Sequence, residues 1–259
     1  MDMVTTYLSR NDLEQLARQV IAQYKKSCIP QFHLCYNVDP TELANLLGYN
    51  VEYSYLSQDG SVLGQTTAAP LWTTVIDAEQ GETYYYLDGQ TILIEKRLQS
   101  NPRAIGRKNF TIAHELAHQL LNRYFPGAYS SKGQHYCFNR KVVKQGVSNW
   151  NEWQADTLAA ALLLPKEAIE EAMFIFGLGP KIKVLSKKYS EYKYDRFCEM
   201  AEFLGVSKTT LAYRMEHLGL LERNCLVEEA QKRRGVVYYG TEKRKQCGPD
   251  QDCGPLQSV

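Results

Sequence analysis

The sequence predicts an α+β fold, in which a small, largely antiparallel sheet packs on two buried helices and a further helical segment follows. Three observations carry this prediction. Short runs rich in β-branched and aromatic residues fill the region 51–94. From Pro102 onward, the apolar residues recur at helical rather than alternating spacing. Beyond Lys181, two more helical stretches flank a turn at 204–207.

The N-terminal region is predicted to be helical. Over residues 2–26, apolar side chains recur near helical spacing among charged ones, which is typical of an amphipathic helix, and Pro30 lies just beyond its end. A second, short helix should begin after Asp39, since an aspartate N-cap followed by Pro40 is a helix-start signal. Gly48 should close it.

Strands are expected where turn residues separate the β-type runs, at 51–55, 71–76, 83–87 and 91–94. Asp-Gly pairs and the segment 77–81 provide the turns. The tyrosines at 84, 85 and 86 have two interpretations. They could form a recognition surface, or they could belong to a sheet with one face in solvent.

Two buried helices should follow. Apolar residues within 110–121 cover most of a helix surface, so this helix is predicted to be buried on more than one side. A loop rich in Gly, Ser, Asn and Tyr over 123–148 leads to the second buried helix, 149–164, which must stop before Pro165. Residues 166–176 should form a further helix.

Composition limits the classes of function. The chain of 259 residues is 44% hydrophobic and 23% charged, as in globular proteins. With 30 Lys+Arg against 29 Asp+Glu, its net charge of +1 argues against nucleic-acid binding by bulk charge. The longest apolar run, 158–164, is far shorter than the roughly 20 residues of a membrane span. Seven scattered cysteines without a Cys-x-x-Cys pair, and charges near the N-terminus, favour a cytoplasmic protein with reduced thiols.

The strongest chemical signal is His114-Glu115-x-x-His118. Histidines four positions apart lie on one face of a helix, about 6 Å apart, so that both imidazoles can bind one metal ion. Glu115, one position away, can reach the water on that metal. The alternative is a pair of core histidines satisfied by backbone carbonyls, but two histidines and a glutamate buried without such a purpose would leave polar groups unpaired.

A hydrolytic zinc site needs a third protein ligand and one open position for water. Glu152, near the start of the second buried helix, is the candidate ligand, and Asp156 shares its face one turn later. Asp156 could accept the second imidazole N–H of either His114 or His118, which would fix the tautomer. Alternatively, Glu152 is an acid favoured by the helix dipole and Asp156 merely faces solvent. One Zn²⁺ is the expected cofactor, although other divalent ions could bind such ligands.

Residues 110–118, FTIAHELAH, are followed by residues 151–165, NEWQADTLAAALLLP, in an order that resembles the ImmA/IrrE family of zinc metallo-endopeptidases. The resemblance covers roughly residues 30–220, and the ligand set also resembles that of thermolysin-like zincins. Leu158 stands where Phe is common in the family, which affects packing and not ligation.

The resemblance implies a zincin-type fold and a cytosolic endopeptidase that cleaves a partner transcriptional repressor, one that governs a mobile element or a stress response. Residues 1–30 are too short for a repressor-type DNA-binding domain, so this protein substrate is expected to be a separate chain. We divide the chain into an N-terminal helix (1–29), a metallopeptidase domain (30–180), a helical segment (181–221) and a flexible tail (222–259).

The expected mechanism uses zinc held by His114, His118 and Glu152, with Glu115 as general base toward the metal-activated water. A further donor should stabilise the tetrahedral oxyanion. The candidates, with a slight preference for His135, all lie between the two buried helices: Tyr124, Tyr129, His135 and Tyr136.

Residues 200–211, MAEFLGVSKTTL, resemble a helix-turn-helix, with a small residue, a turn glycine and a serine cap at the expected offsets. One interpretation is DNA contact, through Lys208, Thr209 and Tyr213, steered by Lys187, Lys188 and Arg214. The other, which we favour because the chain lacks a basic excess, is a helical hairpin that packs on the peptidase and helps to receive the repressor. Arg214 stands where an apolar residue is usual, which weakens the match.

Two alternatives to the endopeptidase remain. The chain could be a catalytically silent zincin-fold module that binds a repressor or DNA through residues 195–220, or a zinc-dependent amide hydrolase that acts on a small molecule. The intact Glu115 favours an enzyme, because a purely structural zinc site needs no general base beside its ligands.

Overall fold

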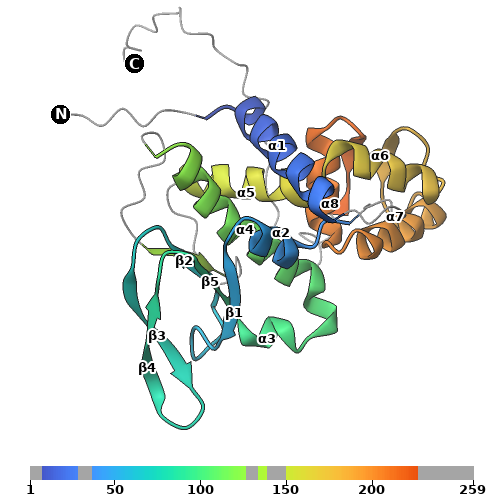
Figure 1. The fold of residues 1–259 in the computed structure, drawn as a ribbon. Coiled ribbons are helices and arrows are strands. Elements are labelled where there is room, and N and C mark those ends of the chain that lie inside the picture. The colour runs from blue at the N-terminus through green and yellow to red at the C-terminus, as the bar shows by residue number, and fades with distance from the viewer. Residues whose placement is uncertain (1–7, 29–36, 127–133, 139–149, 227–259) are drawn as a thin grey trace, which may run out of the picture.

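The computed structural model describes residues 8–28, 37–126, 134–138 and 150–226 (Figure 1). As expected, the fold is α+β. The principal helices are α1 (Arg10–Cys28), α2 (Pro40–Leu46), α4 (Ile105–Tyr124), α5 (Trp150–Leu163), α6 (Lys166–Ile175), α7 (Glu191–Phe203) and α8 (Lys208–His217). A single-turn helix α3 (Lys96–Gln99) and a 3-10 turn (Pro102–Ala104) precede α4.

Capping residues explain where the first two helices begin. Ser9 and Asp12 cap α1 reciprocally, since the Ser9 N–H donates to Asp12 Oδ2 at 2.8 Å and the Asp12 N–H donates to Ser9 Oγ at 3.3 Å. Asp39 caps α2 as predicted, with its Oδ1 accepting from the Thr41 N–H at 2.8 Å. Gly48 ends that segment with a φ of 88°, a conformation that favours glycine.

The main sheet has four strands in the order β1 (Asn50–Ser54), β5 (Thr91–Glu95), β2 (Val62–Thr67) and β6 (Gln134–Phe138). β1 and β5 are parallel, and β2 is antiparallel to both β5 and β6. β3 (Leu71–Asp77) and β4 (Gly81–Leu87) form a separate antiparallel hairpin, which projects from the sheet away from the helices (Figure 1).

Two strands of the sheet were missed by the sequence analysis. β2 contains a glycine and three polar residues that are buried, so it lacks the alternation of apolar and polar residues that identifies a half-buried strand. β6 lies inside the stretch 123–148, which was expected to be a loop throughout. Its pairing with β2 places it at the edge of the sheet.

The two buried helices form the layer that covers the sheet. All residues of α4 from Thr111 to Leu121 are buried, which confirms burial on more than one side. α4 packs on β2 and β5 below it and on α5 above, and α5 also packs on α1 (Figure 1). The helix that carries the two histidines therefore lies at the centre of the molecule.

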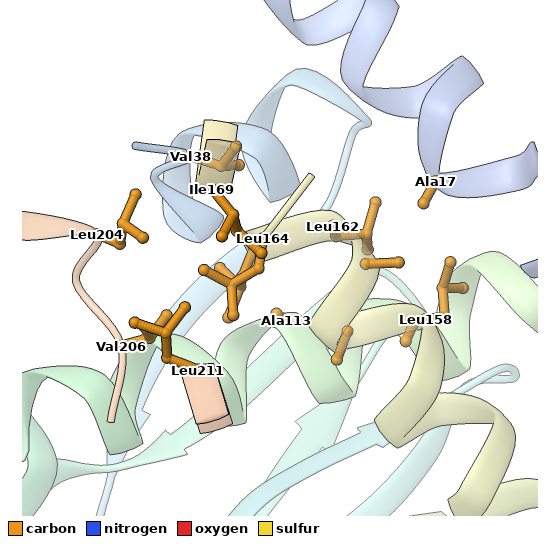
Figure 2. Close-up of a cluster of buried hydrophobic side chains, with 14 of the residues drawn as sticks. Ala17, Val38, Ala113, Leu158, Leu162, Leu164, Ile169, Leu204, Val206 and Leu211 are labelled. Atoms are coloured by element: carbon orange, nitrogen blue, oxygen red, sulfur yellow. The ribbon is translucent and has the colours of Figure 1, made fainter. Parts of the chain in front are cut away.

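The helix-turn-helix-like segment joins this core. One apolar cluster runs from α1 to β8 (Leu221–Asn224), and in it Leu204, Val206 and Leu211 approach Ala113 of α4 and Leu164 (Figure 2). α7 and α8 thus share apolar packing with the metallopeptidase helices.

Close backbone packing fixes the turn between α7 and α8. A Cβ on Gly106 of α4 would lie 2.5 Å from the Ser207 nitrogen and the Val206 carbonyl carbon, so only glycine allows this approach. Asn109 Nδ2 donates to the Gly205 carbonyl at 2.9 Å. The serine cap of α8 is confirmed, because Ser207 Oγ accepts from the Thr210 N–H at 3.1 Å.

The four-part division of the chain stays a prediction. β7 (Ile182–Leu185) pairs in parallel with β8, so residues 222–224, assigned to the tail from the sequence, belong to a strand. The tail from 227 onward lies outside the described residues. Within the part of the chain that the structure describes, no helix is long and apolar enough to cross a membrane.

Candidate metal centre

Two side chains from α4 and one from α5 converge at one point. His114 Nε2 lies 3.0 Å from His118 Nε2 and 3.1 Å from Glu152 Oε2. The third separation, from His118 Nε2 to Glu152 Oε1, is 3.5 Å. The helical spacing of four predicted that the histidines share a face, and the packing of α5 on α4 brings the carboxylate to them.

These separations fit a tetrahedral metal ion. Zinc bonds of about 2.0–2.2 Å place the ligand atoms of a tetrahedron about 3.3–3.6 Å apart. The three observed separations of 3.0, 3.1 and 3.5 Å lie at or just below that range. Two imidazoles and one carboxylate are also a donor set typical of hydrolytic zinc. The residues present therefore fit a divalent cation with one coordination position left for water.

Asp156 orients one of the two imidazoles. Its Oδ1 lies 3.0 Å from His114 Nδ1, one helical turn beyond Glu152 on α5. In the neutral imidazole, donation of the Nδ1 proton to this carboxylate would leave Nε2 of His114 with its lone pair available to a metal ion. The sequence left open which histidine Asp156 would serve, and His114 is the one.

The electrostatic surroundings of His114 favour a positive charge. Burial by itself would lower the pKa of this imidazole, but the hydrogen bonds to Asp156 and Glu152, with the charge of Glu115, raise its pKa to about 10. Three carboxylates therefore surround two imidazoles, and a divalent cation placed between the ligand atoms meets the same favourable field.

Glu115 is fully buried against strand β2. The strand passes so close at Gly64 that a Cβ there would lie 2.7 Å from Glu115 Oε1 and 2.7 Å from Thr111 Cγ2. The sequence analysis did not identify Gly64 as part of the site. Glycine inside a strand is the signal that could have found it, because it often marks a close approach of backbone to another group.

The centre opens to solvent on one side. The side chains of His114 and His118 are 3% and 1% exposed, whereas those of Glu152 and Asp156 are 38% and 34% exposed. The imidazoles therefore lie on the buried side of the centre, and the two acids of α5 lie on its solvent side.

The comparisons with known proteins agree with this geometry. The family model described as the IrrE N-terminal-like domain, of peptidase family M78, matches residues 71–216, more than half of the chain. The chain belongs to this peptidase family. No curated protein sequence matches the chain. The matched residues include both α4 and α5, so the three residues that could hold a metal ion lie inside the family region of this M78 peptidase.

The oxyanion donor of the peptidase stays a prediction. Tyr124, at the end of α4, is 44% exposed. His135 and Tyr136 belong to β6, where their backbones pair with Thr66 and Gln65 of β2, but their side chains lie outside the described residues. Tyr129 lies outside them altogether.

In the helix-turn-helix-like segment of the peptidase, Lys208, Thr209 and Tyr213 are exposed on α8. Lys208 Nζ lies 3.5 Å from Tyr194 OH on α7. A role for these three residues in contacting DNA or a partner stays a prediction. Lys187 and Lys188, the cations expected to steer DNA, are exposed as well.

One of the two interpretations gave Arg214 a role in steering DNA, and for this residue that role is wrong. Its guanidinium is buried and forms a two-pronged ion pair with Glu14 of α1, and its Nε donates to the Leu164 carbonyl at 3.0 Å. A buried side chain that donates three hydrogen bonds to these two partners is not available to steer nucleic acid. It takes the place of the usual apolar residue because Glu14 supplies a carboxylate for it.

Proposed function

We propose that the chain is a zinc-dependent endopeptidase that cleaves a partner transcriptional repressor. One observation carries the enzymatic part. Three ligand atoms lie at the spacing of a zinc tetrahedron, and a buried glutamate stands next to them in the sequence. The repressor as substrate follows from the resemblance to the ImmA/IrrE family.

His114, His118 and Glu152 would hold the metal, and Asp156 keeps His114 in the ligating tautomer. A bound zinc ion supplies Lewis acidity, which polarises the scissile carbonyl and lowers the pKa of water at the open position. The partial exposure of Glu152 leaves that position accessible from the α5 side.

Glu115 is the proposed general base. Its carboxylate takes a proton from the attacking water and then delivers it to the leaving amine. The close passage of β2 at Gly64 restricts where the Glu115 side chain can lie. Fixed placement of a base within reach of its proton is the condition for efficient proton transfer.

The test is Glu115→Gln, which keeps the size of the side chain and removes the base. We expect this variant to bind zinc as the parent chain does and to lose cleavage of a candidate repressor by about 10²–10⁴-fold. Glu171→Gln, on the exposed side of α6, is the matched control and should cleave normally. Full activity of Glu115→Gln would disprove this mechanism.

A chelator separates the enzyme from the silent binding module. The peptidase should lose cleavage in the chelator and regain it when zinc is added back. Binding of a candidate repressor that survives the chelator, with no fragments under any condition, would favour the module instead.

A further inference from the structure

The two faces of the β3–β4 hairpin differ. Cross-strand register pairs Trp72 with Tyr86 and Thr74 with Tyr84. Trp72, Tyr84 and Tyr86 are 63%, 77% and 50% exposed, and the rings of Trp72 and Tyr86 lie 5.2 Å apart. We call these three residues the aromatic face. Most large aromatic side chains are largely buried, so three exposed together on one short hairpin form a distinctive surface.

The opposite face explains how the hairpin is held. Val75 and Leu87 are buried in a small apolar cluster with Leu56 and Leu93. Tyr85 packs on this cluster and donates its hydroxyl proton to Glu52 at 2.6 Å. The alternation in Tyr84-Tyr85-Tyr86 therefore places one ring inward and two outward. Packing accounts for the inward ring and leaves the aromatic face without a structural role.

The hairpin also carries charge of one sign only. Residues 71–90 contain four acids and no Lys or Arg, although the whole chain has a net charge of +1. The acids are Asp77, Glu79, Glu82 and Asp88. Backbone hydrogen bonds from Glu79 and Gln80 lower the pKa of Asp77, so it is ionised at neutral pH. Lys96 is the cation whose charge reaches Asp77, and its Nζ lies 5.4 Å from the centre of the Tyr55 ring.

We infer that the aromatic face is a docking site for a Lys- or Arg-bearing segment of the protein substrate. Lysine and arginine are attracted to the faces of Trp and Tyr rings, and the surrounding carboxylates add long-range attraction. Nucleic acid is a poor match because four carboxylates repel phosphates. A symmetric dimer in which two hairpins face each other is a poor match, because the two sets of carboxylates repel each other. The substrate role rests on the proposed endopeptidase activity.

The root of the hairpin is fixed to the helix that carries the histidines. Gln119, next to His118 in the sequence, donates from Nε2 to Thr66 Oγ1 at 2.5 Å and to the Thr67 carbonyl at 2.8 Å. Gln65 Nε2 donates to Thr73 Oγ1 at 2.7 Å, which ties β2 to β3. The root is thus immobilised close to the metal-binding helix while the tip extends away from it (Figure 1).

The aromatic face lies in the half of the hairpin nearer its root, because Trp72 and Tyr86 form the second cross-strand pair from that end. A substrate that contacts both this face and the metal centre must bind two separate elements, the hairpin and α5. Contact far from the scissile bond would select a particular protein by a surface of its own. An exosite on the hairpin thereby gives narrow specificity to a metal centre that is itself general.

The test measures binding without cleavage. The full chain carrying Glu115→Gln, loaded with zinc, is titrated into a fluorescein-labelled peptide of alternating Lys and Ala, and into a matched peptide of alternating Glu and Ala. We expect the Lys peptide to bind at least roughly tenfold more tightly, and its affinity to fall as salt rises.

Variants of the hairpin test whether its aromatic face and its acids bind the Lys peptide. The double variant Trp72→Ser with Tyr84→Ser should bind the Lys peptide with roughly tenfold lower affinity. The double variant Glu79→Lys with Glu82→Lys should lose affinity to a similar extent. Phe174→Ser, which alters an 87% exposed aromatic residue on α6, is the control and should bind as before. All changed side chains are exposed, and circular dichroism checks the fold. Equal binding of both peptides, or full binding by both hairpin variants, overturns the inference.

Cleavage then tests the link to the proposed function. If the parent chain cleaves a repressor and the Trp72→Ser, Tyr84→Ser variant cleaves it equally well, the exosite is disproved and the peptidase stands. If no repressor is cleaved, the proposed function fails, while the peptide titration still decides whether the hairpin binds cationic segments.

Discussion

Two clusters of charged side chains lie at opposite ends of α5, and they differ in how their charges are balanced. At the N-terminal end of α5, the carboxylates of Glu152 and Asp156 both contact the imidazole of His114, and both acids are partly exposed. Just past the other end, Arg214 and Glu14 neutralise each other, and the Leu164 carbonyl takes the remaining Nε proton.

This difference distinguishes a cluster that stabilises the fold from one that is suited to bind a ligand. The Arg214 cluster contains its own counter-charge and needs nothing from outside the chain, which is the condition for a buried ion pair to persist. The metal-centre cluster has an excess of negative charge and three ligand atoms directed at one point. A cluster whose charge an added cation would balance has the composition expected of a cation-binding site.

Among substitutions in the two clusters, removal of a metal ligand should have the largest effect. In Glu152→Ala, two imidazoles remain, and we expect loss of stoichiometric zinc together with all detectable cleavage, because a hydrolytic site needs three protein ligands. Zinc content by atomic emission and repressor cleavage by gel are the measurements. Glu167→Ala, an exposed acid in the first turn of α6, should change neither. Full zinc occupancy in Glu152→Ala would remove this residue from the ligand set.

Breaking the ion pair between Arg214 and Glu14 should destabilise the fold and leave metal binding unchanged. Arg214→Met leaves Glu14 next to the core without its partner, at an expected cost of about 3 kcal/mol in the free energy of unfolding. Chemical denaturation measures this cost. The double variant Arg214→Met with Glu14→Leu should regain most of the stability, because no charge is then left unpaired. An Arg214→Met chain as stable as the parent would show that the pair is dispensable.

Asp156→Asn should weaken the metal centre without abolishing it. The amide still contacts His114 but no longer provides the charge that fixes the tautomer, so zinc affinity should fall by about 10–100-fold. Competition with a chromogenic chelator gives the value. Asp195→Asn, on the exposed side of α7, is the matched control. Unchanged affinity in Asp156→Asn would mean that His114 is oriented by packing alone.

The smallest change is Gly64→Ala, which adds one methyl group against Glu115. We expect a cost of about 1–3 kcal/mol in stability and a lower kcat, with zinc content unchanged, because the added carbon displaces the base and not the ligands. Gly64→Val should be worse on both measures. A variant series in which kcat does not fall with side-chain size would contradict the role given to this close approach.

Local spacing was sufficient to predict the parts of the site that one helix carries. His114, Glu115 and His118 are placed by the period of α4 alone, and the caps Asp39 and Ser207 act within a few residues of themselves. Such features depend on neighbours in the sequence, which the sequence displays directly.

Other features depend on partners far along the chain. The pair of Arg214 with Glu14 spans 200 positions, and no local pattern distinguishes it from a solvent-exposed cation. Strand β2 was missed because its buried Gln65 and Thr66 are satisfied by Thr73 and Gln119, residues on other elements. A polar residue looks exposed in a sequence until its hydrogen-bond partner is known.

The bond between Arg214 and α1 also bears on how the chain can be shortened. The region that matches the peptidase family, 71–216, retains the guanidinium but excludes the carboxylate at position 14. A fragment trimmed to that region would contain a charged group in its interior with no counterion, beside the last turn of the helix that carries Glu152. We therefore expect the smallest stable unit of this protein to include α1, which supplies Glu14.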